Sequence, residues 1–374
     1  MRPADHRGPS PSSPEPGGGP RPYPGPGHDP RSHPHPGLRT DGNAPRAGQG
    51  THPGPVSSPS APVPDAAAPR RVAVVTDSAA ALPASWVRAF ETAPGFALVD
   101  MPVLIGGQLH TDAEADRASS LVLALAEGRP VTTSRPAPGQ LRAAYRRFED
   151  EGFDAVVSVH LSGELSGTVG AARIARQDIG IPVRIVDTGS AGMGQGLGVR
   201  AALEAAASGA GTDAVARASR ETAQRAQVLI RVRSLETLRR GGRVHPTTAM
   251  VGSMLQLKPL LSLAEGRIVT VERPVSLPRA QQRFMALAGE ALAGAEPERP
   301  VLCVHHVADP HGAREIGELL VDRYRPEAEL VVSELPPVLS AHVGLGTKAA
   351  VIEGPTSTPV THGVNAPQSP ARDP

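Results

Sequence analysis

Apolar residues follow two alternating patterns in the first half of the chain. Short apolar runs predict strands, and longer stretches with apolar side chains three or four residues apart predict amphipathic helices. The predicted strands cover residues 71–76, 97–104, 155–160 and 183–187, and the predicted helices cover residues 83–90, 119–127, 138–151, 166–178 and 192–208. Such alternation is typical of an open α/β sheet with crossover helices.

The second half of the chain mixes hairpin and crossover features. The predicted helices there cover residues 213–226, 235–240, 279–293 and 313–324, and the predicted strands cover residues 228–232, 259–264, 267–272, 301–307 and 329–334, the last of which closes the fold. This mixture indicates an α+β arrangement. At roughly 100–200 residues per domain, we expect two domains, an N-terminal α/β domain over residues 70–211 and a C-terminal α+β domain over residues 212–353.

The two ends of the chain differ in composition from the middle. Pro, Gly, Ser and Arg dominate residues 1–69, and residues 354–374 are rich in Pro, Ser and Thr. Segments of this kind bury too little apolar surface to offset the entropy lost on ordering. We therefore predict disordered extensions at both ends.

Charge and cysteine usage exclude several classes of protein. The 38 basic and 37 acidic residues give a net charge of +1 and are interspersed, so no basic stripe for nucleic acid is present. Cys303 is the only cysteine, which excludes an internal disulfide and a Cys-rich metal site. No apolar run is long enough to span a membrane, and the N-terminus lacks the apolar region of a signal peptide. We expect a cytoplasmic protein with no nucleic-acid partner and no integral membrane segment.

Two hydroxyl-rich segments are candidates for an anion site. Thr132, Thr133 and Ser134 precede a Pro-bounded turn and a predicted helix, and the segment containing Ser162 and Ser166 follows the predicted strand 155–160. Hydroxyls and free backbone N–H groups at the start of a helix bind carboxylate or phosphate. Either segment alone fits helix capping as well, but two loops from neighbouring strands would converge on one crevice.

Arg243 and His342 are further candidates. Arg243 follows the flexible turn Gly241–Gly242, from which its guanidinium group would reach an anion between two domains. His342 lies in the glycine-rich loop 341–346. A surface turn explains the Arg243 segment equally well, and a lone histidine is more often structural than functional. Asp77, directly after the first strand, either contacts a ligand or caps a turn.

Enzyme alternatives have weaker support in the sequence. Ser166, His342 and Asp77 could form a hydrolase triad, but Ser166 is the fourth residue of Gly-Glu-Leu-Ser-Gly, whereas the nucleophile elbow has serine third. The glycines of residues 192–198 match only a relaxed dinucleotide motif, and no P-loop motif occurs. His305 and His306 lack a second cluster of metal ligands, so we expect no metal and no cofactor.

Taken in order, the motifs of this chain resemble the DegV family of bacterial lipid-binding proteins over about residues 71–352. The similarity rests on residues 75–78, 82–83, 101–103, 132–139, 158–162, 165–168, 186–188, 192–194, 235–243, 251–253, 257–259, 309–310, 341–342, 344 and 346.

The resemblance implies a two-domain fold that encloses one long-chain fatty acid, with the carboxylate at the domain interface and the acyl chain in an apolar tunnel. Some members of the family present the carboxylate to a separate fatty acid kinase, which forms the acyl phosphate. The carboxylate-binding positions carry over to Thr133, Ser134, Ser162 and Ser166, with Arg243 and His342 completing the polar network; Thr133 and Ser166 are favoured. The protein would then be a non-catalytic binding subunit. Its alternatives are a stand-alone hydrolase or transferase using Ser166 and an interaction protein that uses its Pro-rich arm.

The chain departs from the family pattern near both expected contacts. Arg135 stands where the family usually has Gln, and Gly163–Glu164 where it usually has Ser-Gly; both departures lie in the supposed carboxylate loops. Val275 and Leu277 occupy positions where family arginines tend to lie, in the segment expected to dock the kinase. Head-group preference and kinase docking are therefore the two properties that the resemblance leaves open.

Overall fold

The first sheet is a parallel sheet buried between two layers of helices. The computed structural model describes residues 70–110, 117–244 and 257–354. Strands β1 (Val72–Asp77), β2 (Phe96–Val99), β6 (Ala155–His160) and β7 (Val183–Asp187) pair in the order β2-β1-β6-β7. Every residue of β1 and β6 is buried, as expected for apolar strands with helices on both faces.

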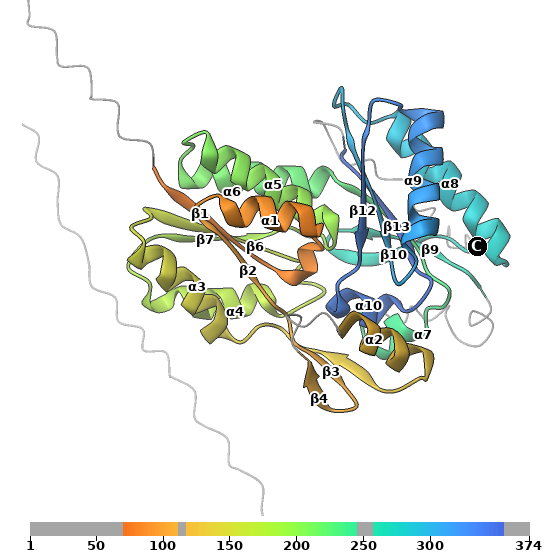
Figure 1. Ribbon diagram of the computed structural model, residues 1–374, viewed down its shortest axis with the longest axis horizontal. Coiled ribbons are helices and arrows are strands. Elements are labelled where there is room, and N and C mark those ends of the chain that lie inside the picture. Colours follow the sequence, from red (N-terminus) through yellow and green to blue (C-terminus); the bar gives the residue numbers. More distant parts are fainter. Residues whose placement is uncertain (1–69, 111–116, 245–256, 355–374) are drawn as a thin grey trace, which may run out of the picture. The chain divides into compact units, whose positions relative to one another are not determined.

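The helices around this sheet are amphipathic or small-residue helices. One face is covered by α3 (Pro138–Asp150) and α4 (Thr168–Ala175), which is followed by the 3-10 turn η2 (Arg176–Asp178). The opposite face is covered by α1 (Ala84–Thr92), α5 (Met193–Ala207) and α6 (Thr212–Arg225), as Figure 1 shows. The first half of the chain thus has the predicted α/β architecture.

The second sheet is mixed and has six strands. Its order is β10 (Arg267–Glu272), β9 (Leu260–Ala264), β8 (Gln227–Arg231), β13 (Lys348–Ile352), β11 (Val301–His306) and β12 (Glu329–Glu334). Only β11 and β12 pair in parallel among these strands of the described chain. Helices α8 (Leu277–Ala293) and α9 (Pro310–Tyr324) pack on one face. Met193 and Leu197 of α5 pack on the other face, so α5 contacts both large sheets.

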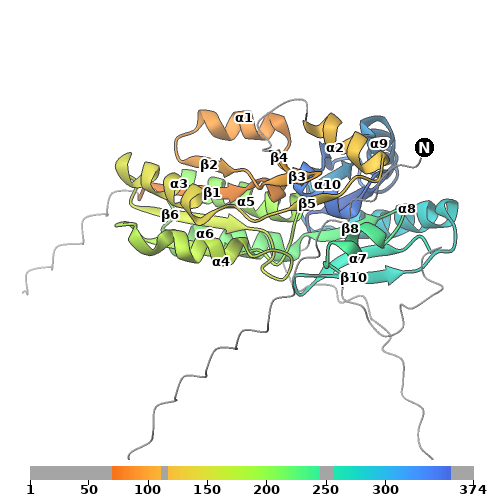
Figure 2. The same cartoon turned by 90° about the horizontal axis from the view of Figure 1, so that it is seen from below.

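A small antiparallel sheet completes the fold. Its strands are β4 (Gln108–His110), β3 (Val103–Ile105) and β5 (Val131–Thr133) in that order. The short helix α10 (Pro337–Val343) contacts β5, α2 (Arg117–Ala126) and α7 (Glu236–Arg240), and Figure 2 shows the grouping from a second direction. Segments from the middle and the end of the chain therefore meet beside this sheet.

Glycines in α5 permit its close packing. A Cβ atom on Gly196 would lie 2.8 Å from the carbonyl oxygen of Ala80, in the 3-10 turn η1 (Ser78–Ala80) after β1. A Cβ atom on Gly198 would lie 2.7 Å from the carbonyl oxygen of Ser219 in α6. The glycine-rich segment is thus explained by helix packing, without a dinucleotide.

Three features of the predicted pattern are wrong. The predicted strand 97–104 is two strands in different sheets, β2 and β3, separated at Pro102, which has no N–H group for a ladder. Thr132 and Thr133, which were assigned to a hydroxyl-rich loop, belong to strand β5 (Val131–Thr133). The chain does not close with the strand 329–334, because α10 and β13 follow, and β13 pairs between β8 and β11 in the interior of the sheet.

The remaining structural predictions concern boundaries. The division into domains at residues 211 and 212 stays a prediction; α6, which begins there, contacts α5, β6 and β7. The predicted extensions, apart from Gly354, lie outside the described residues, as do the motif positions 251–253.

Candidate functional site

A cavity of about 400 Å³ is lined by residues from both halves of the sequence. Most of its wall is apolar, and the second sheet and α10 provide much of it: Val228, Ile230, Leu263, Ile268 and Val351 from the sheet, and Val338, Leu339 and Val343 from the helix. The volume lies within the roughly 300–1,000 Å³ typical of small-molecule sites. Such a wall suits a ligand with a long apolar part.

Polar groups line the same cavity. Five of the six predicted site residues are among them, namely Thr133, Ser134, Ser166, Arg243 and His342. They come from the end of β5, the loop before α4, the turn after α7, and α10. The structure therefore brings together residues that are far apart in the sequence. One expectation needs correction: the two hydroxyl loops follow β5 and β6, which belong to different sheets.

Thr133 and His342 form a direct contact at this polar end. Thr133 Oγ1 lies 2.8 Å from His342 Nε2. Burial and, to a lesser extent, the nearby Arg243 guanidinium together lower the pKa of His342 to about 4. His342 is consequently neutral at pH 7. In the tautomer that carries a proton on Nε2, the imidazole donates to Thr133, which leaves the threonine hydroxyl free to donate to a ligand oxygen.

The turn Gly241–Gly242 places Arg243. Gly242 has φ +70°, a conformation that favours glycine. A Cβ atom on Gly241 would lie 2.5 Å from His342 Nδ1, so this position also needs glycine for the close approach of α10. Arg243 Nε donates to the carbonyl oxygen of Leu165 at 3.1 Å, and its terminal nitrogen donates to the carbonyl oxygen of Gly241. Both acceptors are neutral.

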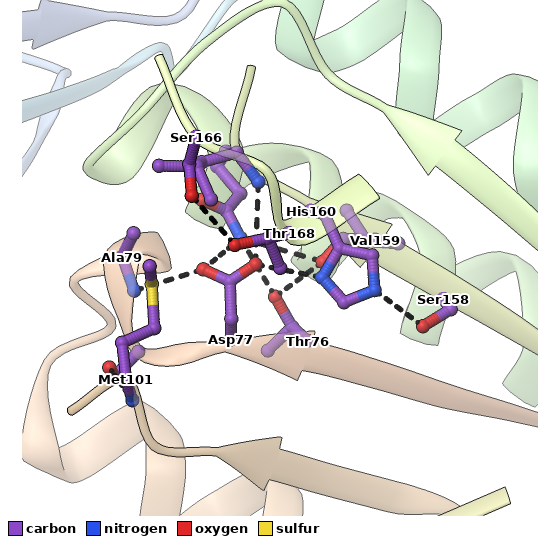
Figure 3. Close-up of polar contacts among 12 residues, drawn as sticks. Thr76, Asp77, Ala79, Met101, Ser158, Val159, His160, Ser166 and Thr168 are labelled. Atoms are coloured by element: carbon purple, nitrogen blue, oxygen red, sulfur yellow. Dashed lines mark hydrogen bonds and ion pairs between the residues drawn. The ribbon is translucent and has the colours of Figure 1, made fainter. Parts of the chain in front are cut away.

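The serines of the two loops have different environments. Ser134 is exposed and lines the cavity. Ser166 is half-buried, and its Oγ lies 2.9 Å from Thr168 Oγ1 (Figure 3). Ser162 is buried and is not among the lining residues; its hydroxyl donates to the carbonyl oxygen of Gly266 at 2.7 Å and accepts from the N–H of Glu164. Ser162 thereby ties this loop to the β9–β10 turn, and its contact with a ligand stays a prediction.

A separate polar chain is buried inside the first sheet. His160 Nδ1 lies 2.8 Å from Asp77 Oδ2, and His160 Nε2 lies 2.7 Å from Ser158 Oγ, which in turn lies 2.7 Å from the Tyr145 hydroxyl (Figure 3 shows the first three residues). All four side chains are fully buried. Asp77 Oδ1 also accepts from the N–H of Ala79, which is the turn-capping role that the sequence offered as an alternative to ligand contact.

The hydrolase triad considered from the sequence is not assembled. Asp77 pairs with His160, His342 pairs with Thr133, and Ser166 pairs with Thr168. The Ser158–His160–Asp77 chain has hydrogen bonds of triad type, yet it is enclosed in the core, where no substrate reaches Ser158.

His305 was considered as a metal ligand, and both of its ring nitrogens are engaged. Its Nε2 accepts from the N–H of Met193 at 3.0 Å, and its Nδ1 donates to the carbonyl oxygen of Ser333 at 3.2 Å. Burial lowers its pKa to about 4. Within the described residues, no group of three or more His, Cys, Asp or Glu side chains is arranged to hold a metal ion. None of the helices in the described ranges is long and apolar enough to cross a membrane.

The family model described as an uncharacterised protein of the DegV family matches residues 71–354, which is most of the chain. This chain belongs to the DegV family. A DegV domain-containing protein of Streptomyces coelicolor is 40% identical over 283 residues, covering 76% of this chain and 98% of that protein.

Solved DegV structures share the fold. A DegV family protein from Thermus thermophilus, described by its fatty acid binding, is 31% identical with a TM-score of 0.67, covering 76% of this chain and 99% of that one. DegV of Bacillus subtilis, described as a fatty acid binding protein, is 26% identical with a TM-score of 0.66, covering 76% and 99%.

Part of the cavity wall could not be predicted from the amino-acid sequence. The apolar wall residues of β8, β9, β10 and β13 have the same pattern as ordinary core, so the sequence contains no local signal for them. His305 and Arg135 also line the cavity. The departure of Arg135 from the DegV pattern was the one available signal for its position at the site.

Proposed function

We propose that this chain binds one long-chain fatty acid, with the acyl chain along the apolar wall and the carboxylate among Thr133, Ser134, Ser166, Arg243 and His342. The observation that carries the proposal is the cavity of about 400 Å³ in which an apolar wall and these polar groups occur together. DegV relatives described as fatty acid binding proteins support it.

The energetics of such a ligand are consistent with the cavity. Each buried methylene stabilises the complex by about 0.8 kcal/mol, so about a dozen methylenes supply roughly 10 kcal/mol before the costs of association. A carboxylate that leaves water needs hydrogen bonds or a cation. The Thr133 hydroxyl and the Arg243 guanidinium supply both.

The further proposal is that the protein presents the carboxylate to a separate, ATP-using fatty acid kinase, which forms the acyl phosphate. Ser134 and Gly167, which line the cavity, are exposed, so a partner reaches this part of the wall from solvent. The chain itself is then a non-catalytic binding subunit, and a partner that uses ATP places it in the cytoplasm.

The proposal is tested by native mass spectrometry of protein purified from a bacterial host, followed by denaturing extraction and lipid analysis. We expect one fatty acid per chain, with at least tenfold weaker retention in Arg243→Ala and His342→Ala. Arg88→Ala, on the exposed face of α1, is the matched control. A chain that stays free of ligand after incubation with saturated and unsaturated fatty acids would contradict the proposal.

The kinase step has its own test. The lipid-loaded protein is mixed with candidate ATP-using subunits, and acyl phosphate is trapped with hydroxylamine as the hydroxamate. Hydroxamate formed by the lone chain would contradict the non-catalytic assignment. No hydroxamate with any subunit encoded by the source genome would contradict the presentation step alone.

A further inference from the structure

The polar end of the cavity carries more positive charge than a carboxylate requires. Arg135 and Arg243 both line it. Within the described residues neither guanidinium is paired with a carboxylate, and Glu164, in the same loop as Ser166, pairs with Arg267 at 2.8 Å. A bound carboxylate supplies one negative charge against these two cations. Arg135 is exposed and solvated, so a second cation remains available to a head group that carries more charge than a carboxylate.

The N-terminus of α4 lies beside Arg135 and adds to the positive charge at this end of the cavity. Its side chain crosses Gly167, where a Cβ atom would lie 2.9 Å from the terminal nitrogen of Arg135 and 3.2 Å from its Cδ. Gly167 is the N-cap residue of α4, and no side chain caps this end of the helix. The N-terminus of a helix is itself positive and favours anions. An anion at this position would therefore interact favourably with both the helix N-terminus and the guanidinium group.

We propose that Arg135 and Arg243 form a second anion subsite, which selects single-chain lipids with a phosphate monoester head group over plain fatty acids. The proposal rests on the proposed fatty acid site, because the acyl chain would occupy the same apolar wall. A phosphate monoester carries close to two negative charges at pH 7 and forms bidentate hydrogen bonds with arginine. It balances the two guanidinium groups, whereas a carboxylate balances one.

Two lipids carry a terminal phosphate of this charge, although the phosphate of the first is joined as an acid anhydride and not as an ester. One is the acyl phosphate formed when a kinase transfers the γ-phosphoryl group of ATP to the carboxylate oxygen and releases ADP. The other is a lysophosphatidate, whose phosphate is separated from the acyl group by glycerol. The spacer moves the phosphate further from the end of the acyl chain, so the two sources place their charge at different depths.

The test compares the binding of three probes to the full-length protein at pH 7.5 by isothermal titration calorimetry. The probes are palmitate, hexadecyl phosphate and 1-palmitoyl lysophosphatidate. We expect hexadecyl phosphate to bind about tenfold more tightly than palmitate. Arg135→Gln, which introduces the residue that the family usually has, should remove this preference while palmitate affinity changes by less than about twofold.

Three further variants test the charge of residue 135, the position of its guanidinium group and the net charge of the protein. Arg135→Lys should keep part of the preference, because the charge remains but the bidentate geometry is lost. Gly167→Ala should reduce the preference, because the added methyl group displaces the guanidinium while Arg135 is still present. Arg88→Gln is the control for net charge and should leave all three affinities unchanged.

The outcomes distinguish this subsite from the fatty acid site. If palmitate binds and hexadecyl phosphate does not bind more tightly, or if Arg135→Gln lowers both affinities equally, the second subsite is overturned. If neither probe binds, the proposed fatty acid function fails as well. Preference for hexadecyl phosphate over the lysophosphatidate supports acyl phosphate as the source, and the reverse order supports the lysolipid.

Discussion

Thr133 at the end of β5 and His342 in α10 are 209 residues apart in the sequence, and their side chains meet at 2.8 Å. The contact joins a strand of the small sheet to a helix near the end of the fold. Because His342 is neutral at pH 7, the pair is a hydroxyl–imidazole hydrogen bond that orients the threonine hydroxyl. This orientation determines the direction in which the Thr133 hydroxyl can donate a hydrogen bond to a ligand.

Replacing Thr133 with valine tests that role. Thr133→Val keeps the shape and removes the hydroxyl, so a buried carboxylate would lose one hydrogen bond and His342 would lose its partner. We expect about tenfold weaker palmitate binding by calorimetry, with near wild-type affinity in Thr133→Ser. Thermal unfolding of Thr133→Val serves as the control, since a half-buried site should lose no more than about 1 kcal/mol of stability. Equal palmitate affinity in the valine variant and the wild type would remove Thr133 from the site.

The pKa of His342 should report the bound head group. In the free protein, burial and the Arg243 charge lower it to about 4. A ligand carboxylate close to His342 favours the imidazolium form and offsets the effect of Arg243. We therefore expect NMR titration to give a higher pKa for His342 in the palmitate complex than in the free protein. The exposed His311, which does not line the cavity, is the internal control, and palmitate should leave its NMR signals unchanged. A His342 pKa that is unchanged or lowered by palmitate would place the carboxylate elsewhere.

Acid should destabilise the fold through His305 and His342. The pKa of each is about 4 in the folded protein, below the ordinary value of 6.5, so the unfolded chain binds more protons between these values. Their contribution to stability is thus complete above pH 6.5 and is lost as the pH falls toward 4. For the buried His305 the loss is up to about 1.4 kcal/mol per pH unit.

Urea unfolding at intervals between pH 7 and pH 4 measures this dependence. We expect the free energy of unfolding to fall with pH, and the slope to become smaller in His305→Gln, although that variant is also less stable at pH 7. His311→Gln, at an exposed position, is the control for the loss of one histidine elsewhere in the fold. A slope that is equal in His305→Gln and the wild type would show that His305 titrates normally in the fold.

The pattern of the sequence predicted those elements whose local chemistry is strong. The strand at residues 155–160 and the helix starting at Pro138 appear as expected, because a continuous apolar run and a Pro-led amphipathic repeat are local signals. In contrast, β13 was missed, although it lies inside the second sheet. Its five residues include Lys348, whose buried ammonium group is held by Asp309 from a distant turn, so nothing local marks it as an interior strand.

The candidate site was likewise predictable only where the local sequence carries a signal. Arg243 and His342 were identifiable because glycines lie near them: Gly241 permits the close approach of His342, and Gly242 and Gly344 have positive φ. The partners of each side chain were not identifiable. Asp77 pairs with His160 instead of His342, since β1 and β6 lie side by side in one parallel sheet, and this register is set by tertiary pairing.

The pair Asp77–His160 should be a major contributor to stability. Asp77 is fully buried and accepts from His160, from the N–H of Ala79 and from Gln195 Nε2. In Asp77→Asn an amide replaces one acceptor oxygen and faces existing donors. We expect a loss of about 3 kcal/mol in the free energy of unfolding, measured by urea denaturation. Asp150→Asn at the exposed end of α3 is the control and should change the stability by less than about 0.5 kcal/mol.

Hydrolase activity through Ser158 or Ser166 should be absent. Ser158 belongs to a hydrogen-bonded Ser–His–Asp chain but is fully buried, and Ser166, which lines the cavity, has Thr168 as its partner in place of a histidine. Neither serine thus combines a general base with access to substrate, and both conditions are necessary for nucleophilic catalysis. We expect no labelling of either residue by a fluorophosphonate probe and no turnover of p-nitrophenyl esters above the level seen with Ser166→Ala. Ester turnover that disappears in Ser166→Ala, with its fold intact by circular dichroism, would restore the hydrolase alternative and show that the side chains around Ser166 rearrange when an ester binds.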